Sequence, residues 1–102
     1  MDRLIHEFTA RARDGDGHVY RARAFGEERA DGSWIGWLEF TPVGGGIMRR
    51  SDRETTQPSR GAVRYWALGL DEVFLDGALA RAMRSSRLPS APSQVDSPAS
   101  SD

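Results

Sequence analysis

The chain of 102 residues contains no cysteine and no lysine. Without cysteine it can form no disulfide, no thiolate metal site and no cysteine nucleophile, and cysteine usage says nothing about its redox compartment. Without lysine, all 14 basic residues are arginine, whose rigid guanidinium suits bidentate and stacked contacts. A GC-rich genome that favours arginine codons is the simpler explanation, because composition alone does not reveal a site.

Long hydrophobic runs are also missing. No stretch approaches the roughly 20 apolar residues of a membrane span, and residues 1–8 lack the apolar core of a signal peptide. We therefore expect a cytoplasmic protein with no membrane partner. The net charge of −1 gives no overall basic field, so any preference for nucleic acid has to come from a local patch.

Alternating side chains predict an antiparallel meander in the first half of the chain. Apolar and polar residues change places at nearly every position, which is typical of half-buried strands. The predicted strands cover residues 4–13, 19–29, 33–42 and a short stretch, 47–50. The glycines 44–46 allow the last reversal.

Two Asp-Gly turns, at residues 16–17 and 31–32, fix the register between the strands. Each resembles a three-residue hairpin loop with glycine in the left-handed position. The predicted partners are Asp14 with His18, Ala12 with Tyr20, Ala10 with Ala22, Phe8 with Ala24, Arg29 with Ser33, Phe25 with Trp37, Ala24 with Leu38, Arg23 with Glu39 and Ala22 with Phe40.

This register sorts the side chains onto two faces of the sheet. The inner face leaves room for a closely packed helix because it is rich in alanine. It collects Leu4, Phe8, Ala10, Ala12, Tyr20, Ala22, Ala24, Leu38 and Phe40. The outer face collects Arg11, Arg13, Arg21, Arg23, Phe25, Ile35 and Trp37, with Glu7, Val19, Glu39 and Thr41 among them. Large apolar groups are uncommon on a solvent face, so this mixture predicts a partner or a cover.

The polar segment 51–58 leads into a predicted helix. Ala62, Val63 and Trp66 recur at helical spacing, and Gly69 is a stop signal. Within the segment, Arg53 and Glu54 are positioned to pair, and Thr55 or Thr56 to cap the helix. An anion-binding loop at the helix N-terminus is the functional alternative.

A short apolar run at residues 73–75 suggests an edge strand. Asp76 then caps a last helix over residues 77–86. The apolar stripe of that helix includes Leu79 and Met83, which either pack on the main core or cover the outer face.

Residues 88–102 are mainly serine, proline and alanine, which predicts a disordered tail. Residues 1–87 are enough for a single domain. The expected fold is α+β: a three- to four-stranded antiparallel meander, one helix packed on one face, a short C-terminal helix and the tail.

The outer face carries the functional hint, and its candidate interaction surface is Arg11, Arg21, Arg23, Phe25, Ile35 and Trp37. These residue types are enriched in interface hot spots, which predicts a non-enzymatic binding module for an unknown protein partner or a second copy of itself. The alternative is single-stranded nucleic acid, held by stacking on the aromatics and by phosphate contacts. Salt bridges and an aromatic pair that merely stabilise the sheet are the simplest interpretation.

The sequence does not predict an enzyme. The candidate groups are His6, His18, Asp52 with Glu54, and Asp71 with Glu72. The histidines are not at metal-ligand spacing, and the acidic pairs follow turns or loops, where carboxylates are solvated or cap helices. The glycines 44–46 are not followed by Lys-Ser or Lys-Thr, so they form no phosphate loop. We predict no catalytic residue, cofactor or metal.

Four runs together resemble a family of small uncharacterised bacterial proteins. They are W-I-G-W-L-E-F from Trp34, R-E-T-T-Q-P from Arg53, Y-W-A-L-G-L from Tyr65 and V-F-L-D-G-A-L-A-R-A from Val73. The resemblance covers roughly residues 18–82. It implies a bacterial, cytoplasmic protein, and it carries over no functional residue because no activity is attached to the family.

Overall fold

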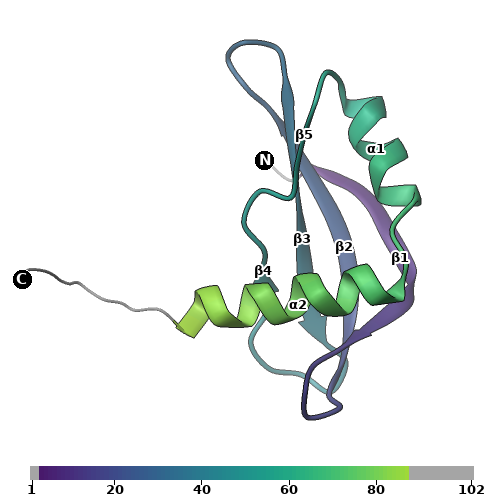
Figure 1. Ribbon diagram of the computed structural model, residues 1–102, viewed down its shortest axis with the longest axis vertical. Coiled ribbons are helices and arrows are strands. Elements are labelled where there is room, and N and C mark those ends of the chain that lie inside the picture. The colour runs from purple at the N-terminus through teal and green to yellow at the C-terminus, as the bar shows by residue number, and fades with distance from the viewer. Residues whose placement is uncertain (1–2, 88–102) are drawn as a thin grey trace, which may run out of the picture.

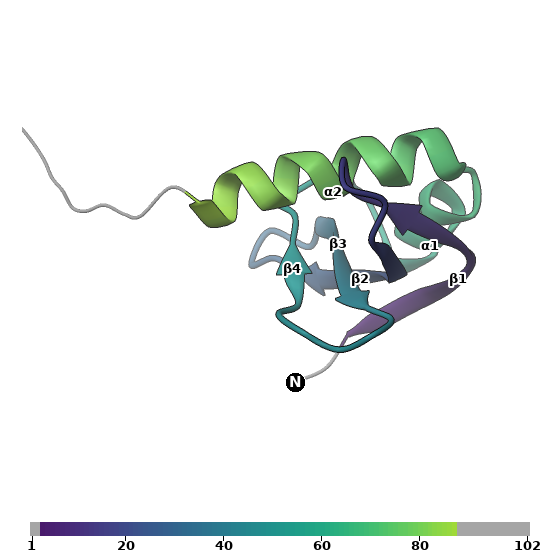
Figure 2. The same ribbon diagram turned by 90° about the horizontal axis from the view of Figure 1, so that it is seen from below.

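The computed structural model describes residues 3–87 as one five-stranded sheet with two helices. The elements are β1 (Leu4–Arg13), β2 (Val19–Glu28), β3 (Trp34–Pro42), β4 (Arg49–Arg50), β5 (Thr55–Gln57), α1 (Arg60–Leu68) and α2 (Glu72–Arg87). The strands β1 to β4 form an antiparallel meander (Figure 1), and β5 pairs with the same edge strand, β3, that β4 pairs with. Both helices pack on one side of the sheet (Figure 2).

The expected α+β fold is confirmed. The predicted disorder of the segment 88–102 concerns residues outside the described range. No helix within residues 3–87 is long and apolar enough to cross a membrane.

The two Asp-Gly turns have the predicted geometry. Gly17 and Gly32 have φ angles of +85° and +88°, which glycine adopts without strain. At the second turn the Arg29 N–H donates to the Ser33 carbonyl at 2.7 Å. The β2–β3 register is therefore as predicted, with Ala22 opposite Phe40, Arg23 opposite Glu39, Ala24 opposite Leu38 and Phe25 opposite Trp37.

The first strand, β1, departs from the predicted register at its centre. Its residues 8–10 lie opposite the single residue Ala22 of β2. The predicted pair of Phe8 with Ala24 is therefore wrong, and the pair of Ala10 with Ala22 is not part of the ladder. Because two extra residues preserve the alternation of side chains, Phe8 still lies in the core.

A second irregularity in β1 lies at Ile5. Leu4 and His6, on either side of it, pair with the consecutive β2 residues Phe25 and Ala24, so Ile5 is an extra residue. A single extra residue reverses the alternation. The predicted inward position of Leu4 is therefore wrong: Leu4 lies opposite the outward-facing Phe25 and is exposed, and Ile5 is buried in its place.

The core lies between the inner face of the sheet and both helices. It contains Ile5, Phe8, Ala12, Tyr20, Ala22, Ala24, Leu38, Phe40, Val63, Ala67, Leu75, Ala78, Leu79 and Ala82. Trp66 and Met83 are partly buried against it. The helix α1 approaches β3 so closely that a Cβ at Gly36 would lie 3.0 Å from Val63 Cγ1 and from Thr55 Cγ2.

Ser59, not Thr55 or Thr56, caps α1. Its hydroxyl accepts the N–H of Ala62 at 3.1 Å. The two threonines belong to β5, because the segment before the helix returns to the edge of β3.

The last helix is longer than predicted. It begins at Glu72, so residues 73–75 are its first turn and not an edge strand. Asp71 accepts the Phe74 N–H at 2.9 Å and satisfies the helix start. Asp76, predicted as the cap, instead accepts the backbone N–H of Arg13 at 2.8 Å and so ties α2 to the end of β1.

Candidate functional site

The outer face of the sheet is the side on which neither described helix lies (Figure 2). Arg11 of β1 lies directly opposite Arg21 of β2, and both side chains are exposed. Like charges directly opposite each other destabilise an antiparallel pair. This pair is therefore a cost to the fold.

A stack of two aromatic rings and two guanidinium groups occupies the centre of this face. The rings of Phe25 and Trp37 are stacked, with centroids 6.1 Å apart and planes inclined by 14°. The Arg23 guanidinium carbon lies 5.4 Å from the Phe25 centroid, and that of Arg50 lies 4.3 Å from the Trp37 centroid. Such cation–π contacts contribute about 0.5–1 kcal/mol each at exposed sites and more when desolvated.

The arginines cover the aromatic rings. Phe25 is 6% exposed and Trp37 is 7% exposed, although both side chains point away from the main core. The predicted cover of the outer face is thus supplied by Arg23 and Arg50 and not by α2, whose Leu79 belongs to the main core. Most of each ring surface is therefore closed to a base or to another apolar side chain.

Arg23 and Glu39 are register partners, as predicted, but no ion pair joins their side chains. The Glu39 carboxylate instead accepts the indole N–H of Trp37 at 3.2 Å. Among the described side chains of residues 3–84, the ion pair between permanently charged groups is Arg81–Glu54, and the His18 ring is hydrogen-bonded to the Asp14 carboxylate. The outward arginines of the described chain are thus left without an internal carboxylate partner.

Ser51 joins the two short strands that share the edge of β3. Four residues, 51–54, span the distance that Trp37 and Leu38 span in β3. The Ser51 hydroxyl accepts the Leu38 N–H at 3.0 Å, and the Ser51 N–H donates to the Leu38 carbonyl at 2.9 Å. The extra length leaves Asp52 and Arg53 bulging from the sheet edge beside Trp37.

The predicted pairing of Arg53 with Glu54 is wrong. Glu54 reaches the opposite way, to Arg81 of α2, with an N–O distance of 2.6 Å. Arg53 is exposed and takes part in no ion pair with a described residue. Its guanidinium therefore stays available at the rim of the outer face.

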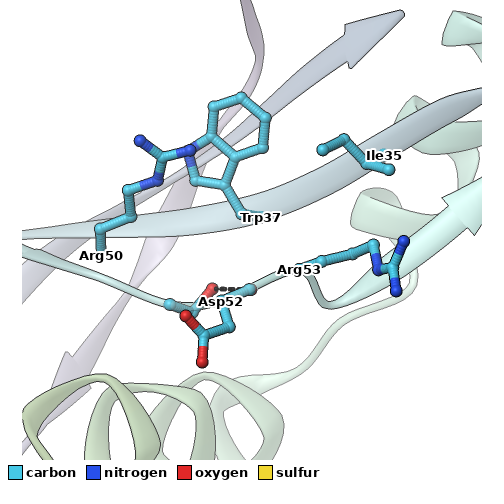
Figure 3. A pocket seen from close by; sticks show the side chains of 6 residues that line it. Ile35, Trp37, Arg50, Asp52 and Arg53 are labelled. Atoms are coloured by element: carbon cyan, nitrogen blue, oxygen red, sulfur yellow. Dashed lines mark hydrogen bonds between the residues drawn. The ribbon is translucent and has the colours of Figure 1, made fainter. Parts of the chain in front are cut away.

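Two hollows flank the Arg50–Trp37 contact. One, of about 250 Å³, is lined by Ile35, Trp37, Arg50, Ser51, Asp52 and Arg53. In Figure 3 the Asp52 carboxylate is directed away from the Trp37 ring, while Arg50 and Arg53 stand on opposite sides of the hollow. The other, of about 390 Å³, is lined by Arg3, Arg23, Phe25, Glu27, Trp37, Glu39 and Arg50.

All six residues of the predicted interaction surface lie on strand positions of the outer face. Arg13 is different, because it lines a separate hollow beside α2 together with Asp76. The sequence prediction missed Arg50 and Arg53. The glycine loop 44–46 fixes no register, so turn chemistry did not show which of the two β4 arginines faces outward.

A second polar cluster lies at the first turn, around the Asp14 carboxylate. It accepts hydrogen bonds from the N–H groups of Asp16 and His18, from the Tyr20 hydroxyl and from the His18 ring at 2.9–3.2 Å. Burial would raise the pKa of Asp14, but the hydrogen bonds from His18 and Asp16 hold that pKa below its usual value. Burial and the neighbouring Asp14 charge raise the pKa of Tyr20.

The ligand atoms of Asp14, Asp16 and His18 lie close enough together to hold a metal ion. We assign no metal to them, because Asp14 is already engaged in hydrogen bonds that shape the turn. The other histidine, His6, is half-buried at the edge of the Phe8 ring, 4.7 Å between centroids.

No protein-family model, curated protein or solved structure matches this chain. The function is therefore argued from the geometry of the outer face alone.

Proposed function

We propose that this protein is a non-enzymatic binding module, and that the outer face of its sheet takes an acidic segment of a protein partner. The observation that carries the proposal is a set of outward guanidinium groups without internal carboxylate partners, namely Arg11, Arg21, Arg23, Arg50 and Arg53. Arginine forms bidentate hydrogen bonds with carboxylates, and because its planar guanidinium is preorganised, less conformational entropy is lost per hydrogen bond formed.

The directly opposed pair of Arg11 and Arg21 supports an anionic partner. A carboxylate between the two guanidiniums turns an unfavourable cross-strand pair into two favourable contacts. The rigid sheet holds these groups in place before binding, which limits the entropy lost on association.

A protein partner is favoured over single-stranded nucleic acid by the state of the aromatics. Base stacking needs an open ring face, whereas Phe25 and Trp37 are each covered by an arginine and expose 6% and 7% of their surface.

A second copy of the chain is the weaker choice of partner. A twofold homodimer through this face would bring the same arginines toward each other, and like charges across an interface weaken association. The partner chemistry that complements the face is a carboxylate-bearing segment.

The test is an NMR titration of the full chain with hexaglutamate and, separately, with an oligothymidylate of matched charge, each at low and high salt. We expect hexaglutamate to shift the backbone signals of Arg11, Arg21 and Arg23. Arg21→Gln should weaken hexaglutamate binding about two- to fivefold, the range of one exposed ionic contact. Arg64→Gln, on the exposed side of α1, is the matched control and should leave affinity unchanged.

The absence of outer-face shifts with hexaglutamate at low salt would reject the proposal. Tighter binding of oligothymidylate through the same residues, with a steep loss of affinity in salt, would assign the face to nucleic acid instead.

A further inference from the structure

The smaller hollow beside Trp37 combines an apolar floor with cationic walls. Ile35 forms the apolar floor, because the ring of Trp37, the next outward residue of β3, is covered by Arg50. Arg50 and Arg53 form the walls, and no ion pair within residues 3–87 occupies either guanidinium (Figure 3). The remaining charged group, Asp52, directs its carboxylate away from the floor.

The ligand that matches this hollow carries an apolar group and an anion very close together. Ile35 and Arg53 line the same side of the hollow in Figure 3, so an apolar surface and a cationic group are adjacent there. In an extended peptide, consecutive side chains point to opposite sides, and same-side neighbours are about 7 Å apart. An internal acidic residue therefore does not place its carboxylate beside an apolar side chain of the same segment.

A C-terminal residue does meet this requirement, because its side chain and its free carboxylate are attached to the same Cα atom. Capture of C-terminal carboxylates is a recurring mode of peptide recognition, and arginine is suited to a planar carboxylate. The hollow, of about 250 Å³, has room for a single residue and not for a longer segment.

We propose that the hollow formed by Ile35, Trp37, Arg50 and Arg53 binds the C-terminal residue of a partner protein, an apolar residue with a free carboxylate. The inference rests on the proposed function of the outer face, whose arginines beyond the hollow take acidic residues farther along the partner segment. The carboxylate accepts hydrogen bonds from the exposed Arg53 guanidinium, and the apolar side chain lies on Ile35.

The experiment uses three probes, Ac-Gly-Ser-Gly-Leu with a free carboxylate, the same peptide as its C-terminal amide, and Ac-Gly-Ser-Gly-Gly with a free carboxylate. Binding is followed by the indole N–H signal of Trp37 and the backbone signal of Arg53 in the full chain. We expect the first peptide to shift both signals. The amide and the glycine peptide should each bind about tenfold or more weakly, because each lacks one of the two contacts.

Arg53→Gln is the decisive variant, because the side chain is exposed and its loss leaves the fold intact. It should weaken binding of the free leucine peptide about tenfold, the effect of one charge-assisted contact. Arg64→Gln, on the exposed side of α1 and away from the hollow, is the control and should leave this affinity unchanged. Equal binding of the free acid and the amide, or full affinity in Arg53→Gln, would overturn the proposal.

The two proposals fail separately. If hexaglutamate binds through Arg11 and Arg21 while the leucine peptide shows no preference for its free carboxylate, the C-terminal site is rejected and the acidic-segment function stands. If neither probe shifts the outer face, both are rejected.

Discussion

The hydroxyl of Ser51 accepts the backbone N–H of Leu38 at 3.0 Å, at the point where β4 has ended and β5 has not begun. Ser51 is the one buried polar residue among those described, with 3% of its surface exposed. Its side chain thus takes the place of a ladder hydrogen bond that the bulged edge does not supply. The same bulge presents Arg53 to the outer face, so this hydrogen bond supports the candidate site.

Replacing Ser51 with alanine leaves the Leu38 N–H unsatisfied in a buried position. We expect Ser51→Ala to lower the free energy of unfolding by about 1–3 kcal/mol, measured by urea denaturation. Hydrogen exchange at the Leu38 amide should become faster. Ser33→Ala, which removes a hydroxyl from an exposed turn, is the control and should cost less. An unchanged unfolding midpoint in Ser51→Ala would contradict this account.

Gly36 lets α1 approach β3. A methyl group there meets Val63 Cγ1 and Thr55 Cγ2 at 3.0 Å, closer than packed carbons normally lie. We expect Gly36→Ala to destabilise the protein by about 1–3 kcal/mol through overpacking. Gly44→Ala adds the same methyl group where no atom lies within 4 Å, and it should be nearly neutral in thermal unfolding. Equal effects of the two substitutions would argue against the close approach.

The opposed arginines predict a conflict between stability and binding. Arg21→Glu places a carboxylate opposite Arg11, and a cross-strand pair of opposite charges contributes about 0.2–1 kcal/mol. We expect this variant to unfold at a higher urea concentration than the wild type and to bind hexaglutamate more weakly. Arg64→Glu makes the same charge change on α1 and should not raise the midpoint. A loss of stability in Arg21→Glu would show that the two guanidiniums do not interact unfavourably.

Asp14 predicts the acid dependence of stability. Despite its burial, hydrogen bonds from His18 and Asp16 lower its pKa from 3.8, so the unfolded chain takes up the proton at a higher pH than the folded one. The stabilisation is complete above about pH 4 and is lost as the pH falls through the lower pKa of the folded state. Urea denaturation at a series of acidic pH values should show a shallower decline in Asp14→Asn.

Part of this decline should persist in the variant. Hydrogen bonds from the side chain and backbone of Ser33 lower the pKa of Asp31 in the second turn. The stabilisation that Asp31 contributes is therefore also lost as the pH falls. Asp52→Asn, which removes an exposed carboxylate without a hydrogen-bond partner among the described residues, is the control. An Asp14→Asn profile parallel to that of the wild type would refute the role of the turn.

The β2–β3 hairpin was predictable residue by residue because its turn chemistry determines its register. Gly32 has the expected positive φ, and every tested pair from Arg29 with Ser33 to Ala22 with Phe40 follows from it. The two-face assignment of Phe25 and Trp37 depended on this register alone, and it was correct. Local backbone geometry was sufficient here.

The irregular positions were not predictable, because their causes are not local. Ile5 turns inward through a bulge and is buried in the core. Nothing in its immediate sequence indicates the extra residue. Residues 73–75 are an exception: they have the composition of a strand, but Asp71 is a local start signal for α2, which the prediction assigned to Asp76 instead. The Arg50 cover over Trp37 depends on the β3–β4 register, which a flexible glycine loop leaves undetermined.

The two irregularities of β1 also bear on how this protein meets other molecules. β1 is the outer strand of the sheet, and uniformly spaced hydrogen-bonding groups on such a strand are a template for intermolecular sheet growth. The extra residues at Ile5 and within residues 8–10 interrupt that spacing twice in ten residues. A strand from another molecule could form only a few consecutive hydrogen bonds with β1 before the donors and acceptors of the two strands no longer align. The two irregularities of β1 therefore disfavour fibrillar aggregation along this edge of the sheet.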